Sequence, residues 1–222
     1  MSELLEHIQI ETNDNPEIAI IWMHGLGADG NDFVPIVSEL DLDGLPGIRF
    51  IFPHANTMPV TISNGYVMRS WYDITGLELG RREDENGLRA SQKEIEAFIE
   101  REKARGIPAS RIILAGFSQG CAMAIQTGLR HAEPLAGLLC LSGYVPLSAN
   151  AATERNDASK STPIFMAHGR YDNVVPFNRA EASRDLLVSL GYALEWHEYA
   201  MQHSLCLEEV QDISAWLKKV LG

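Results

Sequence analysis

The stretch Gly116-Phe117-Ser118-Gln119-Gly120 decides the fold of this chain. It follows the apolar run 112–115 and precedes the helix-compatible segment 121–125, so the pattern predicts a strand, a tight turn and a helix. A serine at the apex of such a turn is exposed and strained, and the flanking glycines let strand and helix approach closely. The stretch is therefore typical of a nucleophile elbow. An ordinary βα loop with a serine between glycines is the alternative, and the rest of the chain has to decide.

Length and charge narrow the class of protein. The chain has 222 residues, which suits one domain over 1–222 better than two. Its 18 basic and 30 acidic side chains give a net charge of −12, and no basic cluster is longer than Arg81-Arg82. Nucleic acid is therefore not an expected partner, and strongly anionic substrates are mildly disfavoured.

Targeting and cofactor signals are missing from the sequence. The first twenty residues are acidic and lack a continuous apolar core, and no apolar run is long enough to span a bilayer. The cysteines form an odd set of three in apolar surroundings, which indicates reduced thiols: Cys121, Cys140 and Cys206. No cysteine-histidine spacing suggests a zinc site, and no glycine-rich phosphate loop is present. We expect a cytoplasmic protein with no stable membrane insertion, no metal and no cofactor.

Apolar runs alternate with helical patterns along the chain. Strands are expected at 18–23, 48–52, 111–115, 136–141, 164–167 and 194–199, with a further antiparallel edge strand at 7–10. Amphipathic helices are expected before Gly106-Ile107-Pro108 and at the end of the chain. Apolar strands with little alternation between helices predict an α/β fold with a mostly parallel sheet covered on both faces. Two stretches, 53–87 and 145–163, are interpreted as irregular, the first as a candidate functional loop and the second as a surface loop.

A serine nucleophile needs a base, usually a histidine that a carboxylate orients. In a parallel sheet these groups gather beyond the carboxyl ends of strands. Asp172 follows the strand at 164–167, and His203 follows the strand at 194–199. The order Ser118, Asp172, His203 is the order that this fold class requires. A helix N-cap would also explain Asp172, but not the histidine one strand later.

The other six histidines fit structural or solvent roles better. His24 and His168 each stand in a His-Gly pair after a strand, where they are expected to shape turns. The remaining four are His7, His54, His131 and His197. Only His203 has both the position and the order of a catalytic base.

Acyl transfer also needs donors for the developing oxyanion. One is the backbone N–H of the residue after the nucleophile, here Gln119, and another comes from a loop after an early strand. The turn His24-Gly25-Leu26-Gly27 supplies that loop, and its glycines would let the Leu26 amide point inward. A plain tight turn is the alternative, and the elbow favours the functional one.

Taken together, these segments resemble the phospholipase/carboxylesterase family of α/β-hydrolases, which includes small bacterial carboxylesterases and acyl-protein thioesterases. The resemblance runs nearly end to end, through segments 22–29, 53–55, 59–62, 71–74, 115–120, 141–144, 168–172 and 203–204. It implies the triad Ser118, Asp172 and His203 and the oxyanion amides of Leu26 and Gln119. It also implies an acyl groove that includes Trp71 and Leu77, although ordinary packing would explain these two residues as well. A homodimer is plausible on the same ground.

Two positions depart from the family pattern, because Cys121 and Gln202 stand where its members usually have glycine. Cys121 has a small side chain that the turn is expected to accommodate. If the glycine at position 202 adopts positive φ in the family, Gln202 carries strain of roughly 1 to 2 kcal/mol or the loop differs.

The expected reaction is hydrolysis of a carboxylic ester with short to medium acyl chains, through an acyl-enzyme on Ser118. An acyl-protein thioesterase or a lysophospholipase is the alternative, and all three demand the same core chemistry. A binding module on the same fold would be expected to lack a triad member or the oxyanion turn, and none is missing. A small peptidase or a dienelactone-type hydrolase fits less well, because no peptide-recognition subdomain is visible and the elbow carries serine.

Overall fold

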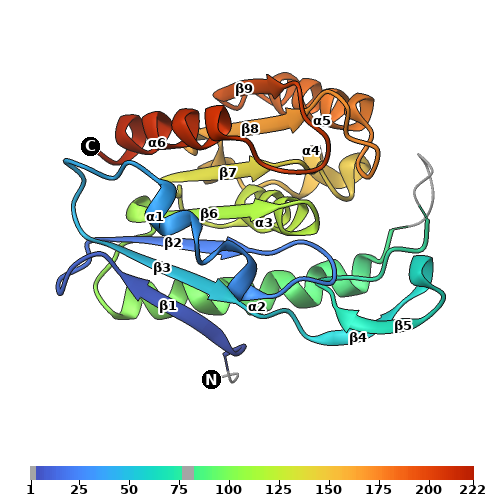
Figure 1. Ribbon diagram of the computed structural model, residues 1–222, viewed down its shortest axis with the longest axis horizontal. Helices are drawn as coiled ribbons and strands as arrows, with labels where there is room; N and C mark the ends of the chain where they lie inside the picture. The colour runs from blue at the N-terminus through green and yellow to red at the C-terminus, as the bar shows by residue number, and fades with distance from the viewer. Residues whose placement is uncertain (1–3, 77–82) are drawn as a thin grey trace.

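The computed structural model describes residues 4–76 and 83–222, and it is built on a seven-stranded sheet (Figure 1). The strands lie in the order β1-β3-β2-β6-β7-β8-β9. Their bounds are β1 (His7–Glu11), β2 (Ile18–Met23), β3 (Ile48–Pro53), β6 (Ile112–Phe117), β7 (Gly137–Leu141), β8 (Ile164–Gly169) and β9 (Leu194–Tyr199). Only β1 is antiparallel to its neighbour, so the predicted parallel sheet and the antiparallel edge strand are both confirmed.

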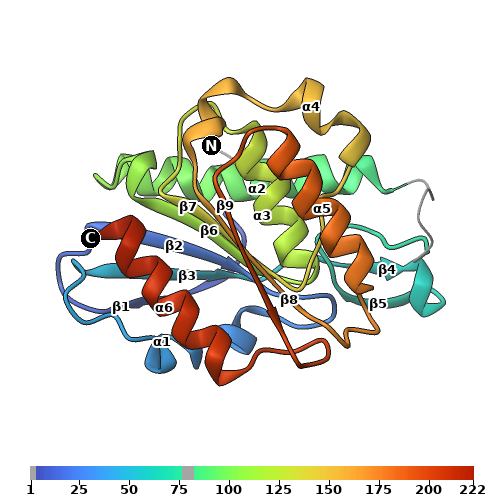
Figure 2. The same cartoon turned by 90° about the horizontal axis from the view of Figure 1, so that it is seen from above.

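Helices cover both faces of the sheet (Figure 2). One face carries α2 (Glu85–Ala104), α3 (Gln119–Arg130) and α5 (Phe177–Ser189), and the other carries α1 (Ile36–Glu39) and α6 (Leu207–Leu221). Successive residues of β2 alternate between the two cores, with Ile21 in the first and Trp22 in the second. A strand buried on both faces needs no polar alternation, which explains the continuous apolar runs of the sequence.

The two stretches that the sequence left irregular contain short elements. A two-stranded sheet forms between β4 (Thr57–Val60) and β5 (Tyr66–Arg69), so the prediction of irregular structure is wrong there. Asn64 and Gly65 both have positive φ in the turn between them, and this dipeptide is a hairpin signal in the sequence. The second stretch holds α4 (Ala151–Glu154) between two short 3₁₀ turns.

Within residues 4–76 and 83–222, no helix is both long and apolar enough to cross a membrane. The organisation of residues 1–222 as one domain stays a prediction.

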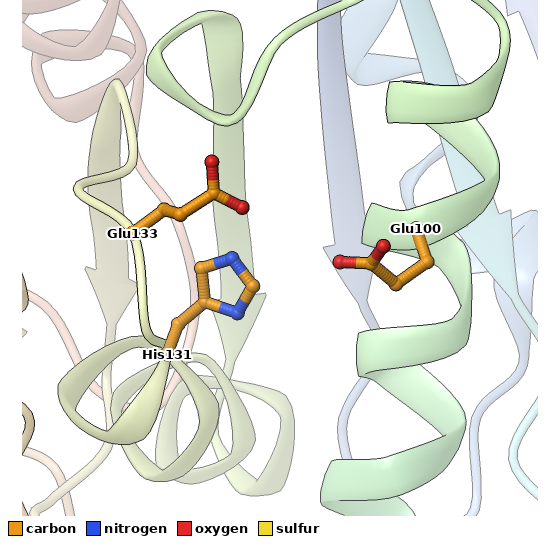
Figure 3. A group of neighbouring side chains, drawn as sticks. All are labelled: Glu100, His131 and Glu133. Carbon is orange, nitrogen blue, oxygen red and sulfur yellow. The ribbon is translucent and has the colours of Figure 1, made fainter.

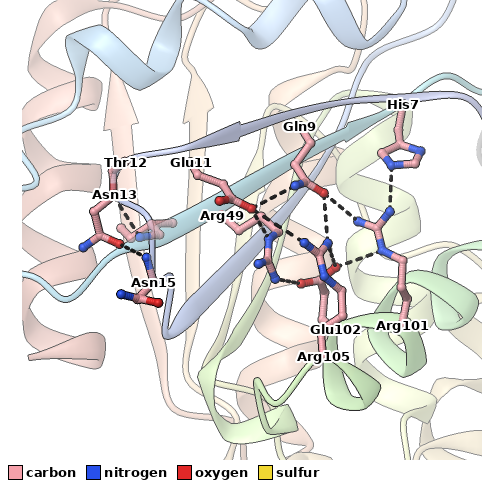
Figure 4. Close-up of polar contacts among 11 residues, drawn as sticks. His7, Gln9, Glu11, Thr12, Asn13, Asn15, Arg49, Arg101, Glu102 and Arg105 are labelled. Atoms are coloured by element: carbon pink, nitrogen blue, oxygen red, sulfur yellow. Dashed lines mark hydrogen bonds and ion pairs between the residues drawn. The ribbon is translucent and has the colours of Figure 1, made fainter.

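A polar network joins α2 to the β1 edge of the sheet (Figure 4). Glu102 is completely buried and accepts hydrogen bonds from Arg49 at 2.5 Å and from Arg101 at 2.9 Å. Arg49 also donates to Glu11 at 2.7 Å. Arg105 donates to the same carboxylate at 3.3 Å, so three guanidinium groups compensate a charge that could not be buried alone, and the pairing fixes how α2 lies on the sheet.

The Glu102→Ala variant tests this network. Removing one member of a buried ion pair leaves Arg49 with Glu11 as its remaining acid, so the free energy of unfolding should fall by about 3 kcal/mol in urea titrations. Glu100→Ala, on the exposed side of the same helix, should cost less than about 1 kcal/mol without added metal. Equal losses in the two variants would contradict the structural role of the network.

A second buried acid predicts a pH dependence of stability. Burial raises the pKa of Glu209, in the first turn of α6, to about 8, against a smaller opposing effect of the Cys206 amide. The unfolded chain releases this proton near its usual pKa of about 4.3, so the folded state binds more protons between these values and loses stability as the pH rises. The loss should be about 3 to 4 kcal/mol between pH 5 and 8. Urea titrations of Glu209→Gln across this range should give a flatter profile than the parent protein.

Candidate active site

Ser118 occupies the sharp turn between β6 and α3. Its backbone has φ 57° and ψ −116°, a region that a residue with a side chain rarely adopts, and its amide donates to the Leu141 carbonyl at 2.9 Å. The glycines of the motif are needed for close approach. A Cβ at Gly116 would overlap the Gly120 carbonyl, and a Cβ at Gly120 would overlap the Met23 carbonyl of β2. The elbow geometry expected from the sequence is therefore present.

Asp172 and His203 meet beyond the carboxyl ends of β8 and β9. The Nδ1 atom of His203 lies 2.7 Å from Oδ2 of Asp172. A carboxylate only accepts, so Nδ1 carries the proton and Nε2 of the neutral ring keeps a lone pair. The His203 ring also contacts Phe117, the residue before the serine, with ring centroids 4.8 Å apart. The structure therefore brings the predicted acid and base together and places the base against the elbow.

The loops that carry Asp172 and His203 bind each other through their backbones. Arg170 donates to the Tyr199 carbonyl at 2.8 Å, and Tyr171 donates to the Met201 carbonyl at 3.0 Å. A Cβ at Gly169 would overlap the carbonyls of the histidine loop, so glycine permits this approach.

Gln202 lies in this histidine loop, next to the base. It is exposed and is not among the residues with positive φ. The strain considered for Gln202 is therefore absent.

His168 is a neighbour of Asp172 that sequence reasoning assigned only to a turn. Its Nε2 lies 2.9 Å from the Val175 carbonyl and 3.2 Å from Oδ2 of Asp172, and the ring is completely buried. The amides of Val174 and Val175 donate to the other carboxylate oxygen at 2.8 and 2.9 Å. The useful signal was the spacing, because His168 is the last residue but one of β8 and lies four residues before the acid.

These donors control the charge of Asp172. Burial alone would raise its pKa, but the hydrogen bonds from the two histidines and the two amides outweigh burial and hold the pKa well below the usual value for aspartate. Asp172 therefore stays ionised beside His203 at neutral pH.

The turn that carries Leu26 lies against the elbow. A Cβ at Gly25 would be 3.4 Å from Cβ of Ser118. Among the hydrogen bonds of the described residues, the backbone amides of Leu26 and Gln119 have no acceptor. Both amides are thus free to donate to a bound oxygen, and their role as an oxyanion hole stays a prediction.

His24 holds this turn in place through hydrogen bonds of its ring. Its Nδ1 donates to the Gly25 carbonyl at 2.7 Å, and its Nε2 accepts from the Ala55 amide at 3.0 Å. Burial lowers the pKa of His24 to about 4, so the ring is neutral and can use one nitrogen as donor and the other as acceptor. The expected turn-shaping role of His24 agrees with these contacts.

The Gln119 side chain, which the sequence did not single out, ties the elbow to the segment after β5. Its Oε1 accepts from the Trp71 amide at 2.9 Å, and its Nε2 donates to the Tyr72 carbonyl at 2.7 Å and to Ser70 at 3.0 Å. Trp71 is only 2% exposed, and its indole donates to the His24 carbonyl at 3.0 Å. These contacts support a positioning role for Trp71 rather than the groove-lining role considered for it. Leu77, the other predicted groove residue, lies outside the described residues.

Cys121 fits its position because glycine stands opposite it. A Cβ at Gly143 would overlap both Cβ and Sγ of Cys121, so Gly143 provides the space that the thiol fills. The thiol is completely buried beside Cys140, where burial also raises the pKa of the Cys140 thiol. Cys121 is therefore accommodated, as expected.

Two cavities adjoin residues of this region. One of about 370 Å³ is lined by Phe33, Phe117, His203, Ser204 and Leu205, with Asp32 and Glu39 among its acidic members. The other, of about 510 Å³, is lined by residues that include Tyr72, Ile74, Tyr144, Leu147 and Leu186. The first cavity therefore gives open space next to the His203 imidazole, and the second lies against Tyr72; Ser118 does not line either of the two.

Comparison with known proteins gives concordant results. A profile of the family described as Phospholipase/Carboxylesterase matches residues 5–221. Acyl-protein thioesterase 1 of Yarrowia lipolytica is 37% identical over 205 residues, which cover 90% of each chain. Acyl-protein thioesterase 1 of Neurospora crassa is 40% identical over 211 residues, covering 91% of this chain and 86% of that protein.

A solved structure also matches this fold. The crystal structure of SOBER1 from Arabidopsis thaliana matches with a TM-score of 0.88 and 32% identity, covering 92% of this chain and 99% of that chain. The predicted α/β-hydrolase fold is thereby confirmed. The chain belongs to the phospholipase/carboxylesterase family of serine hydrolases.

Proposed function

We propose that this protein hydrolyses carboxylic esters of short to medium acyl chains, with Ser118 as nucleophile, His203 as general base and Asp172 as the carboxylate that orients it. The observation that carries the proposal is the 2.7 Å hydrogen bond between Asp172 and His203, beside a serine held at φ 57°. A serine hydroxyl reacts slowly at neutral pH unless a base accepts its proton, and this arrangement supplies one.

The first step is attack of Ser118 Oγ on the acyl carbonyl. His203 Nε2 takes the hydroxyl proton, and the ionised Asp172 stabilises the imidazolium that results. The carbonyl oxygen becomes an oxyanion and accepts hydrogen bonds from the free amides of Leu26 and Gln119, and one such donor is worth about 3 kcal/mol of the barrier.

The second step returns the proton. His203 gives it to the leaving alcohol or thiol, and water then attacks the acyl-enzyme while His203 takes the water proton. The bond between the acyl carbon and Ser118 Oγ breaks, the carboxylic acid leaves, and His203 returns its proton to Ser118. The cavity beside His203 supports this route, because a leaving group that takes its proton from the imidazole must depart on that side.

The nature of the leaving group and the acyl length define the finer function. The relatives named acyl-protein thioesterase 1 support a thioesterase as the second candidate, and lysophospholipase activity is the third. Rates for matched esters and thioesters of increasing acyl length distinguish them: a kcat/KM maximum with short esters supports the proposal, and a maximum with long-chain thioesters supports the second candidate. A cytoplasmic location and a homodimer stay predictions.

Replacing the nucleophile tests the catalytic assignment. Ser118→Ala should lower kcat for a chromogenic ester by at least about 10⁴-fold, because no other hydroxyl replaces it at the elbow. The parent protein should form a covalent adduct with a fluorophosphonate at Ser118, detected by mass spectrometry. Ser189→Ala, on the exposed face of α5, serves as the control with unchanged rate. A folded parent protein that forms no adduct would favour a non-catalytic binding module instead.

Asp172→Asn tests how the acid acts. Asparagine keeps the shape but cannot stabilise the imidazolium or fix the same tautomer, so kcat should fall by about 10³ to 10⁴-fold with little change in KM.

The same variant has a pH signature in stability. The depressed pKa of Asp172 means that its stabilisation is present above the usual aspartate pKa of about 3.9 and is lost as the pH falls below it. The difference in free energy of unfolding between parent and variant should therefore shrink in acid. A difference that is constant down to pH 2.5 would contradict the assigned hydrogen bonds.

Gln119→Ala tests the link between the elbow and the Trp71 segment. The change leaves the buried Trp71 amide without an acceptor, whereas the Tyr72 carbonyl keeps the Ser70 hydroxyl as a donor, and the loss should cost about 1 to 3 kcal/mol in free energy of unfolding. The Trp71 segment also holds the oxyanion turn through His24, so kcat should fall more than KM changes. Gln92→Ala on α2 provides the matched glutamine control. A loss of stability without any loss of kcat would contradict the positioning role.

A further inference from the structure

A cluster of possible metal ligands lies away from the triad, at the far end of α3. It consists of Glu100 on α2, His131 directly after α3, and Glu133 in the following turn. One ligand atom from each residue lies within 4.8 Å of the others, and Figure 3 shows the imidazole and both carboxylates facing a common space. We propose that these three side chains form a binding site for a divalent transition-metal ion such as Zn²⁺.

Two exposed acids alone would not indicate a bound ligand, but His131 does. His131 is only 7% exposed, and its buried Nε2 atom has no hydrogen-bond partner among the described residues. Buried polar atoms are nearly always paired, so an unpaired nitrogen between two carboxylates calls for a missing partner.

Lys103 would compete with a metal ion for the two carboxylates. Its Nζ pairs with Glu100 at 2.8 Å and also with Glu133. The ammonium therefore occupies the cationic position between the carboxylates and holds them together. It leaves the His131 nitrogen unused, whereas a metal ion would bind all three. The Lys103 stem is flexible and partly exposed, so it can swing into solvent when a metal enters.

The ligand set selects the class of metal. One imidazole and two carboxylates suit Zn²⁺ or Co²⁺, whereas Mg²⁺ and Ca²⁺ prefer oxygen ligands alone. Bound at about 2.0 Å in a tetrahedron, ligand atoms stand about 3.3 Å apart, so the cluster must contract slightly. Both glutamates are exposed at the surface and can rotate inward. Water would complete the coordination.

The site would cross-link two helices rather than take part in hydrolysis. It joins α2 to the turn after α3, and α3 has 12 residues between the elbow and His131. At 1.5 Å per residue this separation is about 18 Å, too far for direct contact with Ser118. Metal binding should therefore change thermal stability without changing the rate constant of the active site.

Zn²⁺ titration of the purified protein tests the proposal, by calorimetry and by thermal melting. One Zn²⁺ per chain should bind and raise the melting temperature, and Co²⁺ at the same site should give visible d–d absorption. His131→Gln and Glu133→Gln should each weaken binding at least tenfold, with metal-free melting curves showing that both variants fold. His197→Gln is the matched control, because His197 also lies near two acids, Glu195 and Asp212.

The Lys103→Met variant is a second, independent test. Removal of the competing ammonium should tighten Zn²⁺ binding about tenfold or more. Lys160→Met removes a surface ammonium of the same charge elsewhere and should leave the affinity unchanged. Unchanged affinity in Lys103→Met, or retained binding in His131→Gln with loss in His197→Gln, would overturn the proposal.

Discussion

The contact between α3 and the sheet is the constraint on which the rest of the site depends. Gly120 lies against the Met23 carbonyl of β2, and Gly116 lies against the Gly120 carbonyl, at distances that exclude any Cβ. Only at this separation does the chain reverse within one residue, and Ser118 takes the strain, on the order of 1 to 3 kcal/mol. The cost is offset by the buried contacts of α3, whose apolar residues fill the core beneath it. Nucleophile exposure is thus a consequence of helix packing.

The same contact also positions the groups that surround the serine. Once α3 is placed, its first residue, Gln119, presents a free amide at the elbow and sends its side chain to the Trp71 segment. That segment donates to the His24 carbonyl, and His24 in turn holds Gly25. The two predicted oxyanion donors therefore come from distant parts of the chain, but one continuous set of hydrogen bonds sets their separation.

The sequence predicted those features that short-range patterns encode. Apolar runs predicted the strands, and the serine elbow followed from Gly116 and Gly120 next to such a run. The triad order was predicted because parallel strands all end at one edge of the sheet. The hairpin over 57–69 was missed because its strands are short and exposed, although Asn64-Gly65 is a turn signal.

Tertiary contacts were harder to predict from the sequence. His168 and the side chain of Gln119 act through partners that only the folded chain brings near. Their residue types alone are compatible with many roles. The backbone at Gln202 could not be predicted either, because it depends on the carbonyls that Gly169 allows to approach.

The hydrogen bonds of Asp172 make the acid the most rigidly held member of the triad. One carboxylate oxygen accepts two amides of its own loop, and the other faces both His203 and the buried His168. Because His168 is also anchored to the Val175 carbonyl, the carboxylate cannot rotate to follow His203. The His203 imidazole must therefore adjust its position to keep the hydrogen bond with the fixed carboxylate. The residues on either side of it, Gln202 and Ser204, are exposed and contribute little packing. Adaptation is thus confined to the histidine loop, which explains how this loop accommodates Gln202 without any change in the acid.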